Sequence, residues 1–220
     1  MNRCIALITV LLFTSAVANA QNEKFVKAME QKIAEMGKDL NPETWLATAN
    51  GFERIAEAEK TQWLPYYYAA YSHVMRGYMI GNGQQGNFSD KTDPSADKAE
   101  ALLNQAETLS KDNAEIFIIR KMIASLRLSA DAMNRWQTQL PIGTEALSNA
   151  KKIDPENPRI ILLEGQDKLF TPEAFGGSKS EAKKLFEEAV KKFESRKEPS
   201  SIHPAWGLDQ AKYFLDLAGK

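Results

Sequence analysis

Three stretches of the chain repeat one pattern of small and large apolar residues. A small residue is followed by a large apolar residue four positions later and by an alanine three positions after that, so all three share one face of an α-helix. The copies are Ala99, Leu103 and Ala106; Gly143, Leu147 and Ala150; and Ala182, Phe186 and Ala189. The small residues let a neighbouring helix approach closely. Recurrence of such a face is typical of stacked helical repeats, which usually bind partners rather than catalyse reactions.

The rest of the chain also predicts helices, with almost no strand signal. Asn41, Asp93, Asn157 and His203 each precede a proline, which is the pattern of an N-cap followed by the first helical residue. Residues 178–181 form a Ser-x-x-Glu capping box. The predicted helices are residues 22–37, 42–60, 64–80, 94–110, 114–131, 141–153, 158–169, 179–195 and 204–217.

These motifs resemble the tetratricopeptide repeat, a helix–turn–helix unit. In that family a proline follows the last small residue of the second helix after five positions, as Pro155 follows Ala150, and Gly165 falls at a glycine position of the first helix. The resemblance implies an all-α fold, a right-handed α-α superhelix of about four helix pairs plus a C-terminal capping helix, with Trp206 covering the last repeat. Residues 63–70, 157–159 and 175–177 are also similar to secreted repeat proteins of Gram-negative bacteria.

The spacing of the units departs from this family. Units that begin near Leu64, Ala114 and Pro158 are longer than the family's repeat, and the surplus lies in residues 81–93, 131–140 and 171–178. We expect these insertions to gather along one edge of the solenoid. Two interpretations stay open: the edge is a functional surface, or the insertions are tolerated extensions.

The first twenty residues are typical of a signal peptide. Arg3 precedes a mostly apolar run over residues 5–13, and a small-x-small cleavage site follows at residues 18–20. We expect cleavage after Ala20, a single helical-repeat domain over residues 21–220, and a periplasmic or secreted location. The alternative is an uncleaved anchor; no later stretch is long enough to span a membrane.

Cleavage would leave 27 basic and 29 acidic residues, a formal net charge of −2, and would remove Cys4, the single cysteine. A chain without basic excess is a poor ligand for nucleic acid. A mature chain without cysteine has neither a disulfide nor a thiolate ligand.

No motif indicates catalysis, a cofactor or a metal site. His73 and His203 lack metal-ligand spacing and are expected to pack or cap. The spacing of Asp90, Asp93 and Asp97 does not fit a calcium loop, and Asp93 is better explained as a cap. Neither a Gly-x-Ser-x-Gly elbow nor a phosphate-binding glycine loop is present.

We therefore predict a non-catalytic scaffold that binds a protein or peptide through its concave groove or its insertion edge. The predicted contact residues, which face the groove if the repeat resemblance holds, are Tyr68, Met75, Arg76, Met122 and Arg159. We expect the first three to be exposed, and Ile118, Leu162 and Leu169 to belong to the core. The alternatives are a small-molecule site formed by the same tyrosines and, less favoured, a hydrolase with acids on separate helices. An apolar groove could also pair with a second copy.

Overall fold

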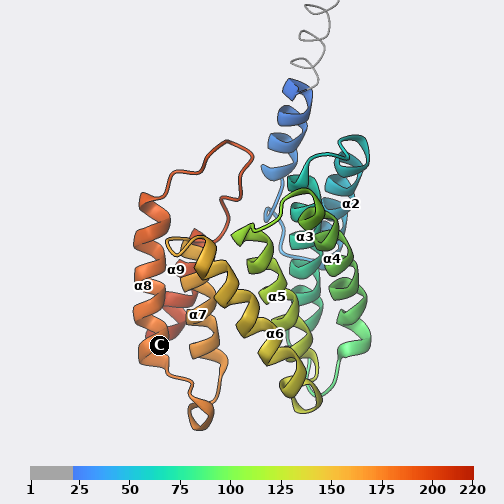
Figure 1. Cartoon of the computed structure of the whole chain (residues 1–220). Helices are drawn as coiled ribbons and strands as arrows, with labels where there is room; N and C mark the ends of the chain where they lie inside the picture. Colours follow the sequence, from blue (N-terminus) through green and yellow to red (C-terminus); the bar gives the residue numbers. More distant parts are fainter. Residues whose placement is uncertain (1–21) are drawn as a thin grey trace, which may run out of the picture.

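The computed structural model describes residues 22–220, and over this range the chain is all-α, as predicted (Figure 1). Residues 22–33 are helical. They are followed by α2 (Pro42–Ala58), α3 (Trp63–Gly81), α4 (Ser89–Leu109), α5 (Ala114–Ala130), α6 (Ala132–Ile153), α7 (Pro158–Phe170), the 3-10 turn η1 (Glu173–Phe175), α8 (Lys179–Ser195) and α9 (Leu208–Gly219). Within this range, none of the helices combines the length and the apolar character needed to cross a bilayer.

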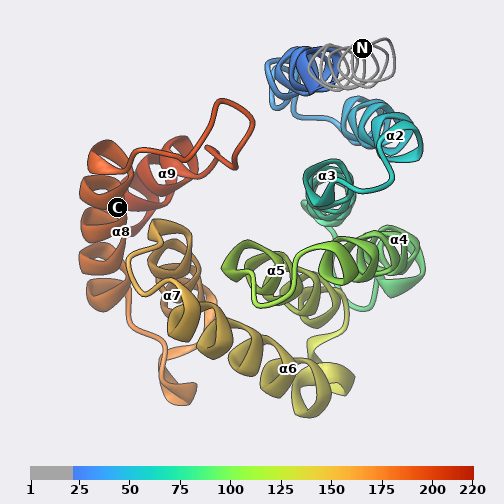
Figure 2. The ribbon, with the colours of Figure 1, turned by 45° about the horizontal axis from the view of Figure 1, so that its top comes forward.

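Consecutive helices pack against each other. The main pairs are α3 with α4, α5 with α6, α2 with α3 and α7 with α8, and α9 packs on α8. The three small–large–small stripes lie on α4, α6 and α8, and all nine of their residues are buried. The stripes therefore have the packing role that their pattern predicts. Figure 2 shows the helices following one another around an arc from α2 to α9.

Three of the predicted caps are present. The backbone N–H of Thr44 donates to Asn41 Oδ1 at 2.8 Å, and that of Arg159 donates to Asn157 Oδ1 at 3.1 Å. The N–H of Glu181 donates to Ser178 Oγ at 3.2 Å, which confirms the start of α8. Each bond satisfies a donor that the first helical turn leaves unpaired.

The predicted start of two helices was wrong, because the insertions at residues 81–93 and 131–140 are partly helical. α4 begins at Ser89 and α6 at Ala132, so Pro94 and Pro141 lie inside helices. Asp93 is not a cap: both of its carboxylate oxygens accept from Arg135 at 2.7 Å. This bidentate pair joins the N-terminal part of α6 to α4, and such a contact between distant segments has no local sequence signal.

His203 is not a helix cap either, since α9 begins four residues later than predicted. Residues 196–207 are non-helical, and we call them the strap. Figure 1 shows that the connections α3–α4, α5–α6 and α7–α8 lie along the same edge of the molecule, the lower one in that view, as the repeat resemblance implies. We call this the insertion edge.

Candidate functional site

The strap reaches back to α3, more than 130 residues earlier in the chain. Tyr68 Oη donates to the carbonyl of Ile202 at 3.1 Å, and Trp206 Nε1 donates to Tyr67 Oη at 2.8 Å. Beyond the strap, Gln210 Nε2 of α9 donates to Tyr71 Oη at 3.0 Å. These bonds join the last segment of the arc to its early part.

Aromatic rings fill the space between α3 and the strap. Tyr71 and Trp206 stack with centroids 4.6 Å apart, and Tyr67 packs edge-to-face on both Trp63 and Tyr68. Burial raises the pKa of Tyr67, Tyr68 and Tyr71 above its usual value, so their phenols stay protonated at physiological pH. The three tyrosines therefore act here as neutral hydrogen-bonding and stacking groups.

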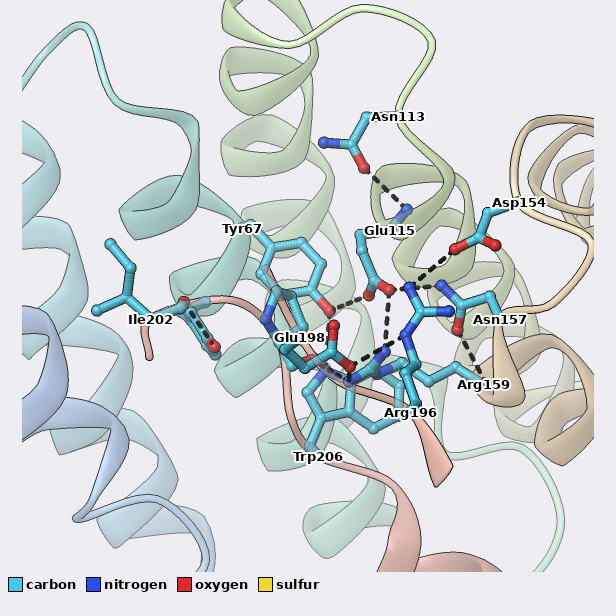
Figure 3. A network of polar contacts seen from close by, with 12 residues as sticks. Tyr67, Asn113, Glu115, Asp154, Asn157, Arg159, Arg196, Glu198, Ile202 and Trp206 are labelled. Atoms are coloured by element: carbon cyan, nitrogen blue, oxygen red, sulfur yellow. Dashed lines mark hydrogen bonds and ion pairs between the residues drawn. The ribbon is translucent and has the colours of Figure 1, made fainter. Parts of the chain in front are cut away.

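A buried ionic network lies next to these rings, and Arg159 is at its centre (Figure 3). Its Nη1 donates to Glu115 Oε1 at 3.0 Å, and its Nη2 donates to Glu198 Oε1 at 3.2 Å and to the carbonyl of Pro204. The guanidinium also lies 5.2 Å from the ring centroid of Trp206. Arg159 thereby connects α7, α5 and the strap.

The network keeps Arg159 charged although the side chain is fully buried. Burial disfavours the charged form, but the attraction of Glu115 and its other partners outweighs burial and raises the pKa of Arg159. Glu115 in turn accepts from Tyr67 Oη at 2.9 Å and from Asn157 Nδ2 at 2.7 Å. Each charge thus has compensating hydrogen bonds, which a buried ion pair needs.

A cavity of about 280 Å³ opens beside this network. Its walls are Trp63, the turn at residues 110–115, the turn at residues 153–157 and residues 196–203 of the strap. His203 is half-buried in this wall, with its ring centroid 6.1 Å from that of Trp63. We call this space the Trp63 cavity.

A larger hollow of about 550 Å³ lies between α7 and α8. Charged side chains dominate its walls, and the ion pair of Lys168 with Glu181 at 2.7 Å spans it. Leu185 is the single apolar residue among its lining residues. The smaller Trp63 cavity, which combines aromatic rings with charged groups, is therefore the stronger candidate for a ligand site.

The predicted exposure of the groove residues was wrong. Tyr68 is 0% exposed because Phe52 stacks on its ring and the strap binds its hydroxyl, and Met75 is 9% exposed within the core. Arg76 is half-buried and donates to Ser95 Oγ at 2.7 Å. Met122 and Arg159 are buried, as are Ile118 and Leu162, which were expected in the core. Leu169, also expected in the core, is half-buried and packs against it.

The structure brings Tyr68 and Arg159 together at the strap, but Arg76 contacts α4 instead. Trp206 packs against the last helices, as predicted, and also against Tyr71. Sequence reasoning missed Glu115 and the strap. The sequence carries one local signal for this site: two polar residues, Asn157 and Arg159, stand at the start of an otherwise apolar helix.

Comparisons with known proteins give one informative relative. Neither the models of known protein families nor the curated proteins give a match to this chain. Among solved structures, the HusA haemophore from Porphyromonas gingivalis is 32% identical, with a TM-score of 0.76; the alignment covers 88% of this chain and 92% of HusA.

The chain belongs to the HusA family. Membership of the HusA family accounts for the all-helical architecture, whereas none of the comparisons assigns the chain to the tetratricopeptide repeats.

Proposed function

We propose that this protein is an exported carrier of haem or a closely related porphyrin. The observation that carries the proposal is the relationship to HusA, a haemophore, over nearly the whole of both chains. The proposal favours the ligand-binding alternative over the scaffold that the sequence suggested. Export through cleavage after Ala20 belongs to the proposal, since residues 1–21 lie outside the described range.

Part of the lining of the Trp63 cavity has the chemistry that such a ligand uses, beside four carboxylates from Asp112, Glu115, Asp154 and Glu198. A porphyrin is a flat apolar ring with carboxylate side chains, so it favours aromatic surfaces on its faces and cations at its edge. Trp63 and His203 supply aromatic surfaces, and Lys111 and Arg196 line the same cavity.

The finer features of the fold also belong to this proposal. Helix pairing around an arc supports a right-handed superhelix of the tetratricopeptide type and a single domain over residues 21–220. Tyr68 and Arg159 contribute to binding by holding the strap over α3. Contact of Met75, Arg76 and Met122 with a bound partner stays a prediction.

Titration with ferric haem tests the proposal. We expect a saturable change in the Soret absorbance, and we expect Trp63→Leu to weaken binding by about tenfold. Loss of an aromatic face costs about 0.5–1.5 kcal/mol, and 1.4 kcal/mol corresponds to tenfold in Kd. Trp136→Leu on α6, far from the cavity, is the matched control and should bind as the wild type does. Absence of saturable binding by the wild type would refute the proposal.

One observation favours a protein partner as a second function. Met133, Trp136 and Leu140 are 88%, 53% and 47% exposed, and their spacing places them on one face of α6 at the insertion edge. An exposed apolar helical face of this kind suits docking to another protein.

Site-specific photocrosslinking tests this second function. A photoreactive residue at position 136 should form a discrete adduct with an envelope protein in cells that express the protein. The control is the same residue at position 183, which is exposed on α8. Identical patterns from both positions would exclude the insertion edge as a specific docking surface.

A further inference from the structure

The strap is attached to the helices by few contacts. In the part of the chain that the structure describes, residues 197–206 form one backbone-to-backbone hydrogen bond, and it lies within the strap itself. Ile202 and Pro204 are buried, whereas Ala205 is exposed, so side chains at alternate positions hold the strap in place. Segments with so few attachments are the ones that open locally while the rest of a protein stays folded.

Both hydrophobic cores are formed mainly by helices. The larger core contains Ile202 as its one buried strap residue, and the smaller core is formed by α7, α8 and α9. Beneath the strap, Tyr68 of α3 also stacks on Phe52 of α2 with ring centroids 5.0 Å apart. In the smaller core, Phe186 stacks on Phe214 without any strap residue between them. Detachment of the strap therefore removes Ile202 from the larger core and leaves the helix pairs packed.

The ionic network allows the strap to leave without an unpaired buried charge. Arg159 donates to Glu198 and to the carbonyl of Pro204 in the strap, but it also donates to Glu115 of α5. Glu198 pairs in turn with Nε of Arg196 at 3.2 Å, and both of these residues belong to the strap. When the strap detaches, Arg159 keeps Glu115 and Glu198 keeps Arg196. The largest cost of breaking a buried ion pair, an uncompensated charge, is therefore avoided.

The surface beneath the strap is aromatic. Tyr67, Tyr68 and Tyr71 are 0%, 0% and 2% exposed, and each of them bonds to or stacks on a strap residue. The strap also forms one wall of the Trp63 cavity. Its detachment would uncover three phenol rings of α3 and would widen this cavity at the same time.

We propose that the strap is a gate, which detaches from α3 as one unit while both hydrophobic cores stay folded. The closed gate buries the tyrosine face of α3, and the open gate exposes it. This inference goes beyond the proposed function and does not depend on which ligand the protein carries, so either can fail without the other.

The reactivity of introduced thiols tests the gate. The mature chain expected from cleavage after Ala20 contains no cysteine, so a single introduced cysteine reports on one position. Ile202→Cys places a thiol under the strap. Ile119→Cys makes the same change at a fully buried position of α5 in the same core and is the matched control.

We expect the thiol at position 202 to react with dithionitrobenzoate at least about 100-fold faster than the thiol at position 119, because local opening costs less than global unfolding. The rate at position 202 should also depend little on urea, since opening of the strap exposes little surface. Equal rates at the two positions, rising alike with urea, would overturn the gate, because the strap would then detach only when the whole protein unfolds. If Ile202→Cys does not fold, Pro204→Cys gives the same comparison at a second buried position of the strap.

Two tyrosine variants test which bond holds the gate closed. Tyr68→Phe removes the hydrogen bond to the carbonyl of Ile202 and should raise the reaction rate at position 202 by about 2- to 10-fold, the usual net effect of one hydrogen bond. Tyr66→Phe also removes a phenol oxygen from α3, but this hydroxyl donates to the carbonyl of Ala56 at 3.3 Å and not to the strap. It should leave the rate at position 202 unchanged. An equal effect of the two variants on this rate would also overturn the gate.

Discussion

Replacement of Arg159 with methionine should lower the free energy of unfolding by about 3–5 kcal/mol, as expected when a buried ion pair loses one partner. The side chain is fully buried, and its removal leaves the largely buried Glu115 without its cation. The strap would also lose the bond from Arg159 to Pro204. Urea denaturation followed by circular dichroism measures the loss.

Two further variants make this prediction specific. Arg120→Met breaks a partly exposed pair with Glu107 and should cost about 0–1 kcal/mol. Adding Glu115→Gln to Arg159→Met should recover part of the loss, because the uncompensated charge is then gone. A loss below about 1 kcal/mol for Arg159→Met, equal to that of Arg120→Met, would contradict the central role of the network.

Replacement of Phe186 with alanine should cost about 3–5 kcal/mol, the usual range for a buried phenylalanine. Phe186 is fully buried in the middle of the third small–large–small stripe and stacks on Phe214 at 5.7 Å. Its ring occupies the space above Gly165, where an added Cβ would come within 2.6 Å of Phe186 Cε1. The surrounding helices leave a cavity when this ring is removed, and the lost contacts destabilise the junction of α7, α8 and α9.

A second phenylalanine provides the control. Phe175 is 81% exposed in η1, so Phe175→Ala should change stability by no more than about 0.5 kcal/mol. Both variants remove the same atoms, so their difference measures packing alone. Similar losses for the two variants would show that the stripe on α8 is not a core interface.

Most helices could be predicted from the sequence because local signals specify them. A helix is specified by apolar spacing and by capping residues within a few positions of each other, and the caps at Asn41, Asn157 and Ser178 are of this kind. The stripe of small residues also predicts close packing between successive helices. Signals that span only a few positions do not reveal the pairing of Arg135, in the added N-terminal part of α6, with Asp93, 42 residues away.

The candidate site was much less predictable. Tyr68 was expected to face an open groove, but its hydroxyl donates a hydrogen bond to a carbonyl 134 residues later. Glu115 has no distinguishing local pattern, and it is notable only because Tyr67, Asn157 and Arg159 converge on it. A buried charge is tolerated only where several partners meet, and their meeting depends on the path of the whole chain.

The amino-acid sequence alone thus determined the helices, their pairing and the insertion edge, because these depend on periodicity, caps and small-residue faces within single segments. Only the tertiary structure decided where the strap lies, which tyrosines it covers, and that Trp63 and His203 share a cavity. These features depend on contacts between segments more than 100 residues apart, which form only when the arc of helices brings the strap back to α3.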